Sequence, residues 1–148
     1  MSVVAEGGRL IAYMNVLLTF LFLAFFATSA YGYMQNITVV GQVICNKRTH
    51  GFAKVELRER DTLDPDDTLK EVTTGRDGKF NLFGKEDEVT KIAPYLRITH
   101  ECDVPKKAGK KCVRVSIIEI PQSKIGTTYQ MNFVNMDIHG PNDKVTCK

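Results

Sequence analysis

Four cysteines constrain the fold of this chain more than any other feature. Cys45, Cys102, Cys112 and Cys147 all follow an apolar N-terminal segment. An even set of cysteines behind such a segment is typical of a secreted domain stapled by two disulfide bonds. Three pairings are possible. We favour Cys102–Cys112, which would close a hairpin across a Lys/Gly-rich turn, together with Cys45–Cys147, which would tie the first strand to the last.

The N-terminal segment has the layout of a signal peptide. Arg9 precedes an apolar run from Val16 to Phe26, and the small residues 27–30 follow that run. The run is about half as long as the ~20 residues that a membrane-spanning helix needs. We therefore expect residues 1–30 to be a signal peptide cleaved after Ala30. Residues 31–148 should form one secreted, extracellular domain that does not span a membrane.

Beyond residue 31 the sequence has the pattern of short β-strands. Ala53, Val55 and Leu57 alternate with charged residues, which is the period of a half-buried strand. Asp77-Gly78 is a strong hairpin signal. Similar patterns predict further strands at Ile37–Cys45 (with a bulge or edge position at Gly41), Leu69–Thr74, Lys79–Phe83, Leu96–Cys102, Val113–Ile117, Tyr129–Phe133 and Val145–Cys147. The expected fold is all-β, a seven-stranded β-sandwich with at most one short helix, at Glu86–Ile92.

Several short motifs resemble the nematode transthyretin-like family. They occur in order at Val39–Asn46, Asp61–Leu69, Gly75–Phe80, Pro94–Cys102 and Cys147. The resemblance implies a secreted, transthyretin-like seven-stranded sandwich. It also implies an adaptor role, because at least one member of the family bridges phosphatidylserine on dying cells to a phagocyte receptor. Two loops depart from the family pattern, at Thr49-His50-Gly51-Phe52 and Gly140-Pro141-Asn142-Asp143.

An enzymatic role is not expected. The transthyretin fold is similar to that of a 5-hydroxyisourate hydrolase, whose site uses histidines, an arginine and a C-terminal Tyr-Arg-Gly-Ser. This chain ends in Val145-Thr146-Cys147-Lys148 and has no histidine in its first expected strand. It therefore lacks a general base and a polarising cation at the expected places. We predict neither catalytic residues nor a cofactor.

A metal site is not expected either. His50, His100 and His139 occur singly, and His100 reads as a hydrogen-bonded core residue. An acidic stretch could supply oxygen ligands to calcium, but it lacks the spacing of an EF-hand. Its composition predicts a solvated turn between strands. Its members are Glu59, Asp61, Asp64, Asp66 and Asp67.

The sharpest binding signal is a cluster of basic residues. Its members are Lys106, Lys107, Lys110, Lys111 and Arg114. Lysines at a hairpin tip offer point charges to phosphate, sulfate or carboxylate, so the cluster is a candidate site for anionic lipid or glycosaminoglycan. The competing interpretation is a solvated turn that protects a sheet edge from aggregation.

Further expectations concern glycosylation and partners. Asn36-Ile37-Thr38 is an N-glycosylation acceptor near the new N-terminus. The formal net charge of +3 selects no class of partner, and we expect no nucleic acid partner.

The leading hypothesis is a non-enzymatic extracellular adaptor that binds a cell-surface receptor or anionic lipid. The alternatives are a glycosaminoglycan-binding module and a carrier of a small apolar ligand at an oligomer interface.

Overall fold

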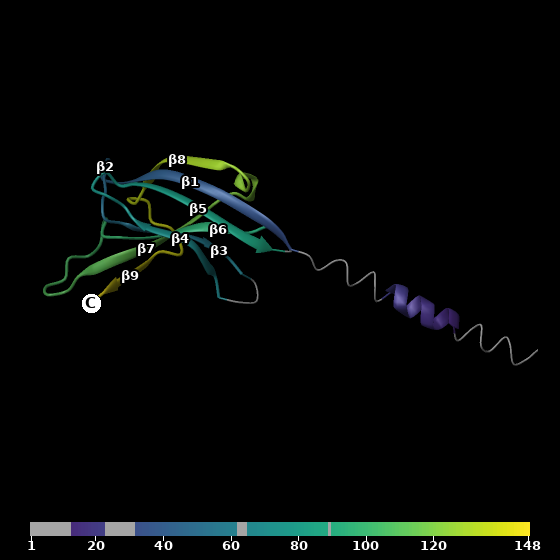
Figure 1. Ribbon diagram of the computed structural model, residues 1–148. Coiled ribbons are helices and arrows are strands. Elements are labelled where there is room, and N and C mark those ends of the chain that lie inside the picture. The colour runs from purple at the N-terminus through teal and green to yellow at the C-terminus, as the bar shows by residue number, and fades with distance from the viewer. Residues whose placement is uncertain (1–12, 23–31, 62–64, 89) are drawn as a thin grey trace, which may run out of the picture. The chain divides into compact units, whose positions relative to one another are not determined.

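The computed structural model describes residues 13–22, 32–61, 65–88 and 90–148. The chain divides into two units, Met1–Tyr33 and Met34–Lys148. In the first unit, residues 13–22 are helical (Figure 1). No helix among the described residues is both long and apolar enough to cross a membrane. The cleavage position expected after Ala30 lies outside the described residues.

The second unit is a sandwich of two β-sheets, which confirms the predicted fold class (Figure 1). One sheet is built around β1 (Tyr33–Cys45), which pairs with β2 (Arg48–Thr49), β5 (Lys79–Glu88) and β8 (Thr128–Asn135). The other has the order β4 (Asp67–Thr73), β3 (Lys54–Glu59), β6 (Pro94–His100), β7 (Cys112–Glu119) and β9 (Lys144–Cys147). Among these, only β2 and β9 have fewer than six residues, so seven longer strands form the body of the sandwich.

The core lies between the two sheets and follows the period-two pattern of the sequence. Ala53, Val55 and Leu57 are fully buried, and so are Leu96 and Ile98 on the paired strand β6. A buried aliphatic side chain contributes about 1.5–3 kcal/mol relative to an exposed one, so this face fixes the register of both strands.

Gly41 marks a bulge, as predicted. The register between β1 and the parallel strand β8 shifts between Val40 and Gly41. A Cβ atom at Gly41 would lie 2.7 Å from Cζ of Phe80, so the missing side chain lets the Phe80 ring pack against the backbone of β1. The bulge and the packing of the core are therefore linked at this position.

The predicted helix at Glu86–Ile92 is wrong. β5 continues to Glu88, and its exposed and covered residues alternate to its end. The charged residues of this stretch do not break the strand, because strand geometry turns every second side chain to solvent. The described part of the second unit has one short 3-10 helix, at Gln122–Lys124.

Candidate anion-binding site

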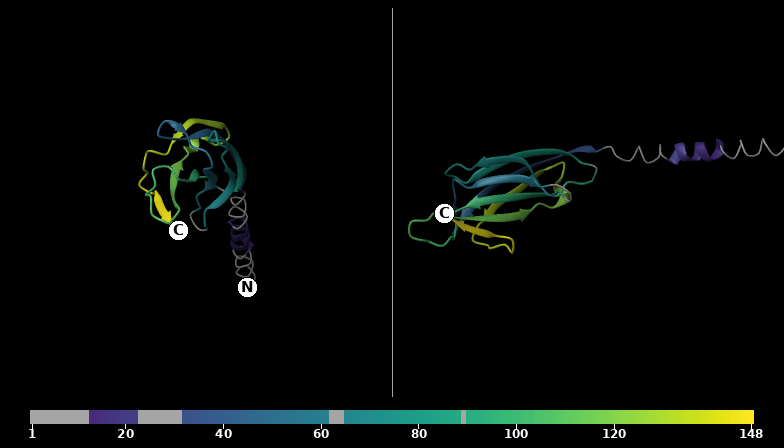
Figure 2. Two further views of the ribbon diagram at one scale, coloured as in Figure 1. Left: turned by 90° about the vertical axis from the view of Figure 1, so that its left-hand side faces the viewer. Right: turned by 90° about the horizontal axis from the view of Figure 1, so that it is seen from below.

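The basic cluster lies on the hairpin that joins β6 to β7. Residues 101–111 connect the two strands, and Lys107 pairs with Lys110 through a hydrogen bond from Lys110 N to Lys107 O of 3.1 Å. Gly109 adopts a φ of +69° in this turn, a conformation that glycine adopts without steric cost. The hairpin extends beyond the strands at the end where the C-terminus lies (Figures 1 and 2).

Two different disulfide bonds hold this hairpin. Cys102 pairs with Cys45 at the end of β1, and Cys112 pairs with Cys147 at the end of β9. The predicted pairing of Cys102 with Cys112 and of Cys45 with Cys147 is therefore wrong. The β6–β7 ladder ends at His100 and Arg114, and Cys102 turns toward the other sheet. Cys112 lies directly opposite Cys147 on the neighbouring strand β9.

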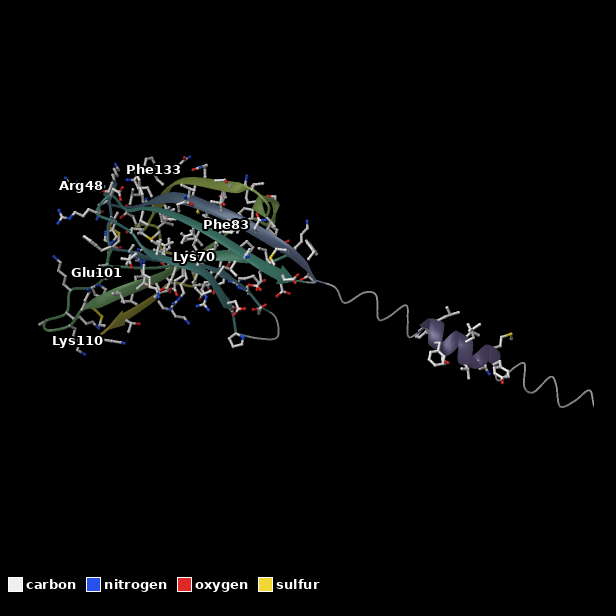
Figure 3. All side chains as sticks on the ribbon, viewed as in Figure 1. Arg48, Lys70, Phe83, Glu101, Lys110 and Phe133 are labelled. Atoms are coloured by element: carbon white, nitrogen blue, oxygen red, sulfur yellow. A yellow bond between two sulfur atoms is a disulfide. The ribbon has the colours of Figure 1, made fainter. Side chains whose placement is uncertain are left out.

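Four of the five predicted residues are exposed on the hairpin. Lys106, Lys107, Lys110 and Lys111 are all exposed, and all four line one surface concavity together with Glu101 and Asp103. The Lys111 side chain forms an ion pair with Glu101 at 2.7 Å. The backbones of Lys111 and Lys148 are joined by two hydrogen bonds. Figure 3 shows Lys110 at the tip of the hairpin, with Glu101 nearer the sandwich. Three lysines, 106, 107 and 110, have no ion pair within the part of the chain that the structure describes.

Lys148 is a basic neighbour of the hairpin that the sequence analysis missed. It is exposed, and its backbone lies beside Lys111 because β9 pairs with β7. The sequence holds no local signal for this contact, since it depends on which strand lies beside β7. The pairing of Cys112 with Cys147 would have supplied that signal.

Arg114 does not belong to the exposed patch. Its side chain is 1% exposed and makes hydrogen bonds to the Met136 carbonyl and to His139. Its Nε lies 3.5 Å from Asp143 Oδ2, which belongs to a side chain that is 8% exposed, and its Nη1 lies 3.9 Å from Asp103. Arg114 therefore anchors the loop after β8 to β7, and its charge is engaged inside the protein.

His100 is a buried, hydrogen-bonded residue, as the sequence predicted. Its Nδ1 accepts the backbone N–H of Cys102 at 3.2 Å, and its Nε2 lies 3.1 Å from Ser116 Oγ. Since Nδ1 is an acceptor, the proton of the neutral ring lies on Nε2 and points at Ser116. Burial, aided by the positive charge of Arg114, lowers the pKa of His100 to about 4.

The hydrogen bonds of Ser116 run in the opposite direction to those of a catalytic serine in a hydrolase. Ser116 Oγ donates a hydrogen bond to Asp143 Oδ2 at 2.8 Å and receives one from His100. A nucleophilic serine needs the opposite arrangement, in which a histidine nitrogen takes the serine proton. Ser116 is also buried, so these three side chains form a structural network.

Of the other predicted residues, the acidic ones lie away from the lysine hairpin, whereas His50 and His139 lie beside it. Asp66 accepts a hydrogen bond from the Tyr95 hydroxyl at 2.7 Å, and Asp67 is exposed at the start of β4. Asp64 lies outside the described residues. His139 Nε2 lies 2.7 Å from Asp103 Oδ2, and the ring of His50 meets that of His100 edge-on at 6.1 Å.

Asn36 lies on β1 with an exposed side chain. Its backbone carbonyl accepts a hydrogen bond from Gly126 N at 2.7 Å, so the backbone of this sequon is ordered by the sheet. About nine strand residues separate Asn36 from Cys45, a distance of roughly 30 Å at the usual rise per residue. The acceptor side chain is therefore well separated from the hairpin end.

The fold and the site together define a small β-sandwich domain with two disulfide bonds and a basic hairpin at one end. The chain belongs to the transthyretin-like family, whose model matches residues 40–121. It is 43% identical to transthyretin-like protein 16 of Caenorhabditis elegans over 91% of this chain and 100% of that protein.

Two other relatives come from the same organism. Identity to transthyretin-like protein 5 is 38%, over 64% of this chain and 66% of the relative. Identity to transthyretin-like protein 33 is 33%, over 78% of this chain and 83% of the relative. A 9R-lipoxygenase from Cyanothece overlaps 73% of this chain and 18% of its own, with 17% identity and a TM-score of 0.47. We draw nothing from that last likeness.

Proposed function

We propose that this protein is a secreted, non-enzymatic extracellular binding module whose lysine hairpin binds the anionic headgroups of lipid, with phosphatidylserine as the leading ligand. Residues 1–30 then act as a signal peptide, and a separate surface binds a cell-surface receptor. Two disulfide bonds fit an extracellular destination. The observation that carries the proposal is the position of Lys106, Lys107 and Lys110, exposed on a hairpin whose two ends are both covalently tethered.

The charge on the hairpin sets the expected strength of binding. Each lysine near an anionic membrane contributes about 1 kcal/mol, so the three unpaired lysines supply about 3 kcal/mol. That energy corresponds to roughly a 150-fold gain in affinity. Because exposed charges are screened over about 8 Å at physiological ionic strength, binding should weaken as salt is added.

Two further features of the structure are compatible with a binding role. The only Ser–His contact described places the serine as a donor to Asp143, which supplies no nucleophile. A glycan at Asn36 would lie roughly 30 Å along β1 from the hairpin end, so glycosylation is compatible with a free hairpin.

The small-ligand carrier receives less support. An apolar groove of about 280 Å³ lies between β7 and β8 and is lined by Met131, Phe133 and Ile138. Pockets for small molecules usually enclose about 300–1,000 Å³. The groove of one subunit is therefore at the lower limit for a carrier.

Co-sedimentation with liposomes tests the proposal. The mature protein should bind vesicles that contain phosphatidylserine and should not bind neutral phosphatidylcholine vesicles. Replacing Lys106, Lys107 and Lys110 by glutamine should remove this binding. The matched control replaces Lys70, Lys85 and Lys91, which are exposed elsewhere and give the same change in net charge.

Three outcomes separate the alternatives. Loss of binding in the hairpin variant alone supports the proposal. Equal binding to phosphatidylserine and phosphatidylglycerol would assign the hairpin a general affinity for anions, and a heparin column would then test glycosaminoglycan. Equal binding by the wild type and the hairpin variant would refute the site.

A further inference from the structure

Three carboxylates meet at the opposite end of the sandwich from the lysine hairpin. Glu59 is the last residue of β3, Asp61 follows two residues later, and Glu88 is the last residue of β5. One oxygen atom from each lies within 4.8 Å of the others. At such distances like charges repel strongly when they are partly buried, so the group needs a compensating positive charge.

Glu59 is the most deeply buried of the three carboxylates, and one of its oxygens has no partner in the described protein. The residue is 4% exposed. Its Oε1 accepts the backbone N–H of Ala93 at 3.4 Å, whereas its Oε2 is buried and has no hydrogen-bond partner among the described residues. A buried carboxylate oxygen without a partner is costly, which indicates that something outside the described protein atoms completes the site.

The neighbouring arginines do not provide the missing charge. Strand alternation directs Arg58 and Arg60 away from the face that carries Glu59. Arg58 donates to the backbone carbonyl of Asp66. Arg60 pairs with Glu119 at 2.8 Å and lies over the Tyr95 ring, 5.2 Å from its centroid.

We propose that Glu59, Asp61 and Glu88 bind a hard divalent cation, with calcium as the occupant. Calcium takes oxygen ligands at about 2.3–2.6 Å, so ligands on opposite sides of the ion are about 4.8 Å apart. The spread of the three oxygens fits inside this shell. Asp61 and Glu88 are only half-buried, which leaves room for the water molecules that complete a coordination number of six to eight.

The site would give the sandwich a second cross-link between its sheets. β3 and β5 belong to different sheets, and a cation held by Glu59 and Glu88 would join their ends. At the other end of the domain, Cys45–Cys102 already joins β1 to the loop after β6. A cation site of this kind would stabilise the domain in calcium-rich extracellular fluid.

A proton is the competing occupant. Burial and the neighbouring carboxylates raise the pKa of Glu59 to about 7, so a shared proton could also relieve the repulsion at neutral pH. The site departs from the expectation of a solvated turn because the third ligand comes from β5, which the acidic stretch alone does not reveal.

Calcium titration of the folded domain tests the proposal. Isothermal titration calorimetry should show one site per chain with a dissociation constant of about 10⁻⁴–10⁻³ M, as in other extracellular modules. At a concentration of about ten times that dissociation constant, calcium should raise the melting temperature by roughly 5 °C relative to a chelator-treated sample. Magnesium should give a smaller rise, because it demands shorter and more regular coordination.

Two variants separate the cation from the proton. Glu59→Gln removes a charge but keeps the shape, and it should abolish the calcium-dependent rise in melting temperature. Asp87→Asn is the matched control, since Asp87 is the exposed neighbour of Glu88 and should leave the rise intact. If Glu59→Gln does not fold, Glu88→Gln takes its place. Absence of calcium binding by the wild-type protein would overturn the proposal.

Discussion

Replacement of Arg114 by methionine should destabilise the domain strongly, because Arg114 is the buried centre of a polar network. Its side chain is 1% exposed and lies 3.5 Å from Asp143, whose side chain is only 8% exposed. Removing one partner of a buried ion pair costs about 3–5 kcal/mol, since the other charge is left buried and unpaired. The Met136 carbonyl would lose its hydrogen bond from Arg114 as well.

The expected loss is therefore about 4 kcal/mol, a large part of the roughly 5–15 kcal/mol that stabilises a small domain. Equilibrium unfolding in urea with intact disulfide bonds measures it. Arg60→Met is the matched control, because the Arg60–Glu119 pair is exposed and such pairs contribute about 0–1 kcal/mol.

A double variant makes the test specific to the network. Arg114→Met combined with Asp143→Asn should recover part of the lost stability, since no buried charge is then left without a partner. If Arg114→Met lowers the free energy of unfolding by less than about 1 kcal/mol, the reasoning is refuted and Arg114 behaves as an exposed residue of the basic cluster.

Three further predictions concern His100, the core and the disulfide bonds. The pKa of His100 is lowered to about 4, so the unfolded chain binds a proton below about pH 6.5 that the folded protein does not bind. The free energy of unfolding should therefore fall by up to about 3 kcal/mol between pH 6.5 and 4, and His100→Gln should reduce that fall. Gly84→Ala should cost about 1–3 kcal/mol in a thermal unfolding experiment, because its Cβ would lie 2.8 Å from Leu69 Cβ and 2.9 Å from Leu57 Cδ2; an unchanged melting temperature would contradict this packing. Non-reducing proteolysis with mass spectrometry should link Cys45 to Cys102 and Cys112 to Cys147, and a Cys102–Cys112 peptide would contradict the structure.

Local patterns predicted much of the sandwich. The alternation at Ala53–Leu57 located β3, and the Asp-Gly turn located the start of β5. The bulge at Gly41 also follows from the sequence, because glycine interrupts a β-branched run there. These features depend on residues close together in the chain, where side-chain periodicity and turn chemistry act directly.

Features that depend on strand neighbours could not be predicted in this way. The alternation of Val113, Val115 and Ile117 indicates one shared face, but the more deeply buried face of β7 carries Cys112, Arg114 and Ser116. Hydropathy predicts that an arginine lies at the surface, whereas most partners of Arg114 lie 22 or more residues further along the chain. The disulfide pairing failed for the same reason, because it depends on β9 lying beside β7.

The most direct test of the central claim is to map where an anionic membrane contacts the molecule. Backbone amide signals of the isotope-labelled mature protein would be followed by NMR while lipid nanodiscs containing phosphatidylserine are added. We predict that signal loss begins at Lys106–Lys111 and at Lys148, and that neutral nanodiscs leave these signals unchanged. Signal loss that begins instead on the outer faces of β5 and β8, around Phe83 and Phe133, would contradict the assignment of the lysine hairpin as the binding site.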